Sequence, residues 1–504
     1  MGQGDAGMQK RLFYGMGANF LGQLINLAAR ILLVPLFLLA WGVDLYGEWL
    51  LLSSMVAYLS LTDLGAQNYV ANRLTQAFAS QDIPLFCRIL HTGLAFFIIL
   101  PTAVFSLFLA IIYLYPPASL LKVSLTGPTT VFGVLAIMAL QFAVSLPEGL
   151  LIRVYQAVGL LPRGVMLANL MQALVIILVA AGLLLKFGIL GIALLQFLPF
   201  VIVLGIALYD LNKRFPHFGI FSWREAEFAL GLTFIKPSLH FLLIQLSQVF
   251  TIQGMVLIVG IILGPVQVVV FATMRTIVNL IRSFFDQLVH AAWPELTRLD
   301  SQQEADKFLA LFRGVLRSTL FAAMVFITVF HFYGGTIYQI WLRKTVAYDP
   351  TVMDLFLLYM AQWIFWLTLS YPLVTTNRHH GLAKMLAASA GLNLVLAYGG
   401  GHFWGLPGVV LGMIAGDLIL PFWMVPFLLS RHMPQFSPAF FRREMVPYIL
   451  SLGFLALVPW LAPVLLLMLA GWWVCCLPGY LLEAGAWERI RRLAPFNPDS
   501  GPKT

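Results

Sequence analysis

One stretch of the chain is apolar enough to cross a membrane and yet carries polar side chains at helical spacing. Within residues 271–288 these side chains recur every three or four positions, as Arg275, Asn279, Arg282 and Asp286. That spacing places them on one face of a helix. A charged side chain at membrane depth costs from ~2.5 to more than ~10 kcal/mol, so this face needs water or an ionic partner. Arginine in such a place suits a phosphate, because its planar fork matches phosphate oxygens.

Other predicted spans carry further polar side chains that could bind a cargo or couple its movement to an ion. Intramembrane ionisable residues normally face a bundle interior or water, so we expect these to line a common polar cavity between the two halves of the chain. Basic residues outnumber acids in the spans, which favours an anionic cargo. The candidates for substrate binding are Arg30, Lys236, Arg275, Arg282, Asn26 and Asn279. The candidates for ion coupling are Asp63, His240, Asp286 and Asp417.

Each candidate also has a structural interpretation. Arg282 and Asp286 lie one turn apart and could form an ion pair with no role in transport. His240 could form a hydrogen bond between helices instead of handling a proton. Asp63 and Asp417 could serve as counter-ions to Arg275 and Arg30, and the amides of the first span could join helices. The sequence leaves these alternatives open.

The composition is that of a polytopic membrane protein. The chain has 504 residues, of which 61% are hydrophobic and only 10% charged. About a quarter of the residues in a soluble domain are charged, so a soluble fold is excluded. Cys87, Cys475 and Cys476 form no disulfide framework, and we expect them to be packing residues. No glycine-rich phosphate loop with its lysine occurs, so we expect no direct use of ATP, and we expect no cofactor and no metal.

Long apolar runs predict the membrane spans. At ~1.5 Å of rise per residue, about 20 apolar residues cross the hydrocarbon. On this basis we predict an all-α polytopic protein with about 14 transmembrane helices. The predicted spans cover residues 12–40, 45–72, 86–115, 129–153, 164–186, 189–210, 228–260, 264–290, 312–338, 353–376, 382–402, 405–429, 445–459 and 461–482.

The basic residues indicate which ends of the spans face the cytoplasm. Most of the 30 Lys and Arg residues fall in connections on the same side as the N-terminus. The connections on the other side carry only Lys122, Lys186, Arg343 and Lys344. Because cytoplasmic loops carry the excess of basic residues, we expect a multi-pass membrane protein with both termini in the cytoplasm.

The two halves of the chain resemble each other in sequence. At one common offset, Gly42 falls on Gly264 and Gly159 on Gly381. Both halves contain six predicted spans in the same orientation, so we predict a parallel repeat about an axis along the membrane normal. The predicted organisation is an N-terminal six-helix lobe, a cytoplasmic linker, a C-terminal six-helix lobe, two extra transmembrane helices and a cytoplasmic tail, at residues 10–212, 213–227, 228–430, 443–484 and 485–504.

Several short motifs resemble those of a known family. Leu45–Trp49 and Leu61–Gly65 resemble the second helix of Wzx-like polysaccharide-export flippases. Trp293–Arg298 is similar to the end of their eighth helix, and Gly405–Gly408 to the turn between their eleventh and twelfth helices. These flippases belong to the multidrug/oligosaccharidyl-lipid/polysaccharide (MOP) exporter superfamily, which includes the MATE transporters. The resemblance implies two six-helix lobes that face a central cavity.

The resemblance also implies a location, the bacterial inner membrane, and a function. Members of this family move an undecaprenyl-pyrophosphate-linked oligosaccharide from the cytoplasmic to the periplasmic leaflet by alternating access, for surface polysaccharides such as O-antigen. The partners would be the lipid bilayer, this polyprenyl-pyrophosphate-linked oligosaccharide, a polysaccharide polymerase and glycosyltransferases, with no nucleic acid. Cationic residues of the cavity would meet the pyrophosphate.

Three other functions stay open. The extra helices at 443–484 resemble those of the fourteen-helix lipid II flippases, so the cargo could be a peptidoglycan precursor. A MATE-like antiporter would instead show acidic residues deep in its N-terminal half. A membrane glycosyltransferase or polymerase commonly needs paired acids near the outer face, where Asp44, Asp349 and Asp354 show no paired arrangement. We therefore expect a transporter and not an enzyme.

Overall fold

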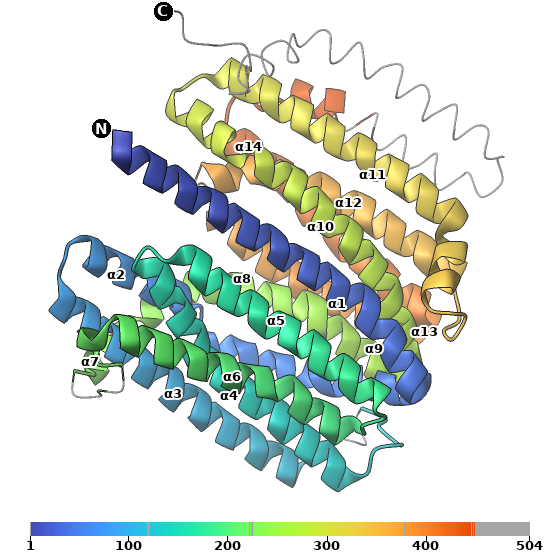
Figure 1. Ribbon diagram of the computed structural model, residues 1–504. Coiled ribbons are helices and arrows are strands. Elements are labelled where there is room, and N and C mark those ends of the chain that lie inside the picture. The colour runs from blue at the N-terminus through green and yellow to red at the C-terminus, as the bar shows by residue number, and fades with distance from the viewer. Residues whose placement is uncertain are drawn as a thin grey trace, which may run out of the picture. The chain divides into compact units, whose positions relative to one another are not determined.

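Every regular element in the described part of the chain is a helix, which confirms the predicted all-α class (Figure 1). A computed structural model describes residues 2–117, 121–220, 222, 225–376, 378, 380–444, 446 and 448. Within them, 10 helical segments are long and apolar enough to cross a membrane. The chain is therefore a multi-pass membrane protein. The two extra helices predicted at 443–484 lie almost entirely outside the described residues.

The helices follow one another in the chain with local signals at several of their starts. Asp82 accepts the backbone N–H of Leu85 at 2.9 Å and so caps α3, and a proline in the first turn begins α3, α4 and α5. The elements up to the middle of the chain are α1 (Gly2–Ala57), η1 (Tyr58–Asp63), α2 (Ala66–Ala79), α3 (Ile83–Leu114), α4 (Pro128–Ala157), α5 (Leu161–Leu184), α6 (Ile189–Arg214) and η2 (Pro216–Phe218). They are followed by α7 (Phe228–Thr233), α8 (Ile235–Val249), η3 (Phe250–Gly254), α9 (Met255–Leu263), α10 (Pro265–Ser301), α11 (Ala305–Trp341), α12 (Pro350–Thr375), α13 (His380–Ile419) and α14 (Pro421–His432).

The chain forms two compact units. The first contains the described residues up to Thr276, together with Thr336–Val352 and Leu386–Gly416. The second contains Ile277–Gly335, Met353–Met385 and the described residues from Asp417 onward. Helices α10, α11, α12 and α13 continue from one unit into the other. The lobe boundaries expected from the internal repeat stay a prediction.

In the first unit, α3, α4, α5 and α6 pack side by side, and α1 runs along α5 (Figure 1). Rings and aliphatic side chains fill the space near the end where α2 joins α3, including the buried Phe86, Phe97, Tyr155 and Phe218. This cluster fixes the relative positions of α2, α3 and α4. It thereby also positions Gln67 of α2 and Arg153 of α4.

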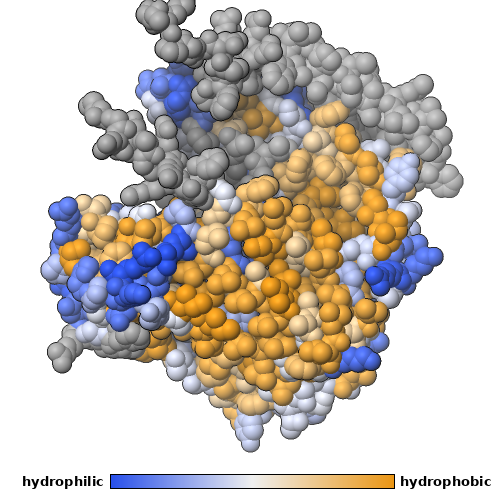
Figure 2. All heavy atoms as spheres, viewed as in Figure 1, coloured by the Kyte–Doolittle hydropathy of each residue, from blue (hydrophilic) through white to orange (hydrophobic). Residues whose placement is uncertain are grey.

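The outer surface of the first unit is suited to lipid. Figure 2 shows a broad apolar surface over α3, α5 and α6, with hydrophilic side chains gathered near the start of α5 and the end of α6. Exposed side chains such as Leu170, Ile177, Leu194 and Leu198 contribute to it. An apolar surface of this extent is rare on a monomer in water, so these helices face hydrocarbon.

Two glycines support the internal repeat. Gly42 interrupts α1 with φ 73° and ψ −176°, and Gly264 separates α9 from α10 with φ 88° and ψ 176°. These angles fall in a region open essentially to glycine alone. The two positions that align in the sequence repeat thus adopt the same unusual backbone conformation, which lets one helix end and the next begin without a loop.

The second predicted span, 45–72, is not a continuous helix. The chain forms the 3₁₀ helix η1 over Tyr58–Asp63, and then Leu64 and Gly65 take positive φ values of 52° and 71° before α2 begins. Asp63 Oδ1 accepts the backbone N–H of Gln67 at 3.1 Å, which satisfies a donor in the first turn of α2. The apolar composition of 45–72 predicted a single span and did not indicate this break.

Later spans also depart from single helices. The predicted span 228–260 is divided into α7, α8, the π-helical η3 and α9. The spans predicted at 382–402 and 405–429 follow one another through Gly405, with φ 61°, and α14 begins only after Leu420. In contrast, the span predicted at 264–290 extends to Ser301 as α10. Near its end, the pKa of the Glu295 carboxyl is lowered by Arg298, which donates to it at 2.9 Å.

Candidate functional site

The polar face of the first span lies on the exposed side of α1. Asn26 and Arg30 are both exposed, and Asn26 Nδ2 donates to the Gly22 carbonyl at 3.0 Å. One turn later Pro35 lacks the N–H that would bond the Ile31 carbonyl. The indole N–H of Trp341 donates to that carbonyl at 2.8 Å instead, so α1 is held beside the end of α11 just after Arg30.

The Asp63 carboxylate caps the first turn of α2 and also lies near a basic side chain. Besides accepting the N–H of Gln67, its carboxylate interacts electrostatically with Arg153 of α4. Arg153 Nε in turn donates to Gln67 Oε1 at 3.4 Å. The base beside Asp63 is thus Arg153, and not Arg275 or Arg30 as the sequence suggested. Arg153 was not among the residues predicted for the site.

The two candidates on α8 are described to different extents. Lys236 is exposed, close to the start of α8. The side chain of His240 lies outside the described residues. One turn after it, Gln245 Nε2 donates to the Ser60 carbonyl at 2.8 Å, which ties α8 to the 3₁₀ helix η1. The Ser60 carbonyl is open to such a donor, because hydrogen bonds within a 3₁₀ helix have poorer geometry than those of an α-helix.

Arg275 bonds to the backbone of the π-helical segment. Its guanidinium donates to the Ile252 carbonyl at 2.7 Å, and its Cζ lies 4.9 Å from the ring centroid of Phe271, one turn earlier. A π-helical turn shifts the bonding pattern by one residue and disturbs the pairing of its carbonyls. Arg275 therefore stabilises η3 as well as carrying a charge within the predicted span.

Arg282 lies in an aromatic environment in the second unit. Its Cζ is 3.7 Å from the ring centroid of Trp363 on α12, which is a close cation–π contact. Asn279, on the same face of α10, is half-buried, and its backbone carbonyl accepts from Ser283 at 2.9 Å. Arg282 is thus built into the packing between α10 and α12.

Two carboxylates complete the cluster around Arg282. Tyr371 donates to Asp286 Oδ1 at 3.5 Å, and Trp366 Nε1 donates to Asp417 Oδ2 at 3.2 Å. Arg282 interacts electrostatically with both Asp286 and Asp417. Asp417 is only 3% exposed, so a cation nearby offsets the cost of burying its charge. The structure therefore brings three of the predicted residues together, as one neutralising cluster in α10, α12 and α13.

Sequence reasoning missed the aromatic part of this cluster. Trp363 and Trp366 stand three residues apart in the span predicted at 353–376, so they share a helix face. A pair of tryptophans at this spacing was a usable signal for a cation partner. Which arginine they would meet depends on how α10 and α12 pack, and a single sequence does not contain that information.

A second missed residue is Glu48, inside the Leu45–Trp49 motif. It is 1% exposed, and its Oε1 accepts the backbone N–H groups of Ser124 and Leu125, each at 2.7 Å. Its Oε2 accepts the hydroxyl of Thr126 at 2.6 Å. Four bonds to one carboxylate, counting the N–H of Thr126 at 3.0 Å, hold the connection between α3 and α4 against α1. The motif thus has a structural role at that end of the first unit.

No protein-family model and no curated protein sequence matches the chain.

The fold, in contrast, is similar to solved transporters. An inward-facing multidrug resistance MATE family transporter of the MOP superfamily matches with a TM-score of 0.67 and 14% identity, over 82% of this chain and 95% of its own. The lipid II flippase MurJ, in an inward closed conformation, matches with a TM-score of 0.60 and 12% identity, over 95% of this chain and 99% of its own. A MOP superfamily transporter from Pyrococcus furiosus, described by a binding pocket of reverse polarity, matches with a TM-score of 0.53 and 13% identity, over 84% and 94%. The chain therefore has the fold of the MOP superfamily transporters.

Proposed function

We propose that this protein is a flippase that moves a polyprenyl-pyrophosphate-linked oligosaccharide across the cytoplasmic membrane for surface polysaccharide synthesis. It would open alternately to the cytoplasm, where the sugar lipid is loaded, and to the periplasm, where it is released. Basic side chains on α1, α8 and α10 would receive the pyrophosphate. No catalytic group is required, because no covalent bond changes.

The extent of the structural likeness carries this proposal. The match to the lipid II flippase extends over 95% of this chain, whereas the match to the inward-facing MATE transporter extends over 82%. The first of these proteins flips a lipid, and the second is named for multidrug resistance. A lipid-linked cargo is therefore the better assignment for a chain that matches the flippase over almost its whole length.

The charges of the helices agree with an anionic cargo. Arg30 and Lys236 are exposed, although each lies on a helix that the sequence places within the membrane. An exposed base at that depth needs water or an anion, and a pyrophosphate supplies the anion. These two residues are the first choice for mutation, since the contacts described above show no structural role for their charges.

The outer acids do not support an enzyme. Asp349 Oδ1 accepts the backbone N–H of Val352 at 3.1 Å and so caps the start of α12. Asp354 Oδ1 lies 2.7 Å from His331 Nδ1 on α11. Both carboxylates therefore hold helices, which favours a transporter over a glycosyltransferase or polymerase with paired acids.

A MATE-like antiporter is the second candidate. The inward-facing MATE transporter has the higher TM-score of the two principal matches, 0.67 against 0.60. Asp286 and Asp417 could then bind a coupling ion. Against this, Arg282 already supplies a positive charge to both carboxylates, so a transported cation would have to compete with it.

Reconstitution distinguishes the two functions. The full chain is placed in liposomes with a fluorescent polyprenyl-pyrophosphate-linked oligosaccharide, and movement between leaflets is followed with a membrane-impermeant quencher. We expect flipping of this lipid, no flipping of fluorescent phosphatidylcholine, and a fall of at least about tenfold in Arg30→Gln or Lys236→Gln, the loss of one charge-assisted contact.

Lys186→Gln is the matched control, since it removes an exposed base from the turn between α5 and α6. Ethidium uptake driven by a proton gradient, without movement of the sugar lipid, would contradict the proposal and favour the antiporter. Equal flipping rates in all three variants would contradict the assignment of Arg30 and Lys236.

A further inference from the structure

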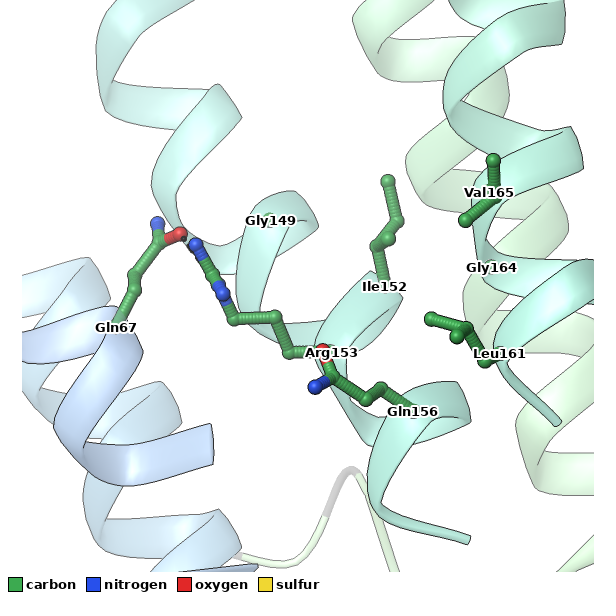
Figure 3. A pocket seen from close by; sticks show the side chains of 8 residues that line it. All are labelled: Gln67, Gly149, Ile152, Arg153, Gln156, Leu161, Gly164 and Val165. Atoms are coloured by element: carbon green, nitrogen blue, oxygen red, sulfur yellow. Dashed lines mark hydrogen bonds between the residues drawn. The ribbon is translucent and has the colours of Figure 1, made fainter. Parts of the chain in front are cut away.

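A cavity of about 250 Å³ opens between α2, α4 and α5 in the first unit, where α4 turns into α5 (Figure 3). Its lining residues differ from those predicted for transport. It combines a polar side with an apolar side, and the two sides come from different parts of the three helices. That combination is what an amphipathic ligand requires.

Three long polar side chains form the polar side. Figure 3 shows Gln67 of α2 and Arg153 of α4 reaching toward each other, with Gln156 about one turn further along α4. Gln67 Nε2 donates to the Leu146 carbonyl at 3.1 Å, which directs the Gln67 oxygen toward Arg153 Nε at 3.4 Å. The guanidinium is therefore held in one orientation at the edge of the cavity, and its fork retains further N–H groups for an anion.

The opposite side of the cavity is apolar. Ile152 of α4 and Val165 of α5 point toward each other there, and Leu161 continues the surface (Figure 3). Glycine permits the close packing around it: a Cβ at Gly164 would lie 2.9 Å from the Ile152 carbonyl oxygen, and one at Gly149 would lie 2.9 Å from Gln67 Oε1. The shape of the cavity thus depends on these two glycines.

The size of the cavity limits its occupant. Sites for drug-sized ligands measure ~300–1,000 Å³. A volume of about 250 Å³ suits a single charged headgroup with the first atoms of a chain, and is too small for an oligosaccharide. The occupant therefore combines a compact anion with an apolar extension.

The charges around the cavity identify the anion-binding group. Arg163, at the start of α5, is taken up by an ion pair with Asp210 at 2.6 Å. Asp63 interacts electrostatically with Arg153 while its Oδ1 accepts the N–H of Gln67. Arg153 is thus the base that lines the cavity, and Asp63 competes with any incoming anion for its charge.

We propose that this cavity binds the phosphate group of a membrane lipid, with Arg153 as the anion ligand and the surface of Ile152, Leu161 and Val165 receiving the start of the lipid chain. Basic pockets between transmembrane helices bind anionic headgroups in this way. The site lies where α4 turns into α5, and hydrophilic side chains gather near the start of α5 on the surface in Figure 2. The proposal does not depend on the cargo proposed above.

Native mass spectrometry of the full chain tests the site. The purified protein is titrated with phosphatidylglycerol, and with phosphatidylcholine as the zwitterionic probe. We expect preferential retention of phosphatidylglycerol, a loss of affinity of about tenfold or more in Arg153→Gln, and a gain in Asp63→Asn, which removes the competing charge. Arg88→Gln is the control, because Arg88 lies at the same end of the unit on α3 and pairs with Glu227 at 3.8 Å.

Two competitors of phosphatidylglycerol, one a lipid and one a soluble anion, identify the source of the phosphate. Undecaprenyl pyrophosphate that displaces phosphatidylglycerol from the native protein, and not from Arg153→Gln, supports the site and shows that it accepts the phosphate of either lipid. Inorganic pyrophosphate that displaces the lipid at equal concentration overturns the lipid assignment, since the apolar side would then contribute nothing. Equal retention of phosphatidylglycerol by Arg153→Gln and Arg88→Gln overturns the site.

A second variant guards against misfolding of Arg153→Gln. Val165→Phe retains every charge and fills the apolar side of the cavity. We expect it to lose lipid retention while the temperature of unfolding in detergent stays within the range of the control variant. Native lipid retention in Val165→Phe would contradict the proposal, whatever the behaviour of Arg153→Gln.

Discussion

Arg275 and Arg282 lie on the same face of α10, about two turns apart, yet their charges are met in different ways. In the first unit, Arg275 donates to the Ile252 carbonyl within a π-helical segment. In the second unit, Arg282 lies over the ring of Trp363 and interacts with Asp286 and Asp417. A periodic polar face on an apolar helix therefore does not define one site. Each turn takes its role from whatever packs against it.

The difference has an energetic consequence. The Ile252 carbonyl is a neutral acceptor. When Arg275 is removed, this carbonyl loses one hydrogen bond, which another group or water can replace. Carboxylates keep their charge when the arginine is lost, and an uncompensated charge away from water is expensive. Arg282 should therefore matter more for stability, and Arg275 more for transport.

The largest effect is expected for Arg282→Ala. It removes the positive charge beside Asp286 and Asp417, which should lower the free energy of unfolding by about 3 kcal/mol. Thermal unfolding of the detergent-solubilised protein measures this loss. The double variant Arg282→Ala with Asp286→Asn should recover part of it, and an unchanged unfolding temperature in the single variant would show that Arg282 does not neutralise the cluster.

Arg275→Ala is expected to have a smaller effect on stability, about 1.5 kcal/mol, for one hydrogen bond with a charged donor. Its effect on flipping should be larger, at least about tenfold, if this charge also meets the pyrophosphate. Flipping assays on Arg275→Ala and Arg275→Lys measure it, with the lysine variant retaining much of the rate. A native rate in Arg275→Ala would assign this residue to the π-helical segment alone.

The cation–π contact of Trp363 with Arg282 should be worth about 1 kcal/mol, and Trp363→Leu also loses the packing of a ring that is only 4% exposed. Double-mutant cycles measure the interaction energy of Trp363 with each of the two arginines. Trp363 should show a coupling of about 1 kcal/mol with Arg282, and within ~0.5 kcal/mol of zero with Arg275. Equal coupling of Trp363 to Arg275 and Arg282 would show that the two arginines do not differ in their surroundings.

The smallest effect is expected for Tyr371→Phe. Its hydroxyl lies 3.5 Å from Asp286 Oδ1, at the long end of the range for a hydrogen bond, so the loss should stay below ~0.5 kcal/mol. Unfolding measured alongside Trp366→Phe gives a useful contrast, because Trp366 donates to Asp417 at the shorter distance of 3.2 Å. A loss in Tyr371→Phe larger than that in Trp363→Leu would show that the carboxylates depend on the tyrosine more than on the arginine.

Composition and periodicity were sufficient for the class of fold. Apolar runs identified the helices, and the polar face of 271–288 did belong to one continuous helix, α10. The break at Asp63–Gly65 had a local signal in its acid and glycine, but Leu64 at positive φ had none. The π-helical segment also had no signal, because its bonding depends on Arg275 from another helix.

The candidate site was predictable only in part. Residue types showed which side chains are expensive within a membrane, and they indicated a possible pair of Arg282 with Asp286, but not that Asp417 interacts with the same arginine. Their partners Trp363 and Trp366 come from a helix distant in sequence, and so does Arg153, the base that faces Asp63. Such pairings follow from three-dimensional packing, which a single chain without relatives does not reveal.

Glu48 has a consequence for the synthesis of the protein. Its first bonded partner, Ser124, lies 76 residues later in the chain. At about 5–20 residues per second, the ribosome needs roughly 4–15 s to make that partner after Glu48 has been made. Throughout this interval the carboxylate lacks these partners, so water must solvate it instead. The bonds that hold the connection between α3 and α4 against α1 can therefore form only after α3 has been made.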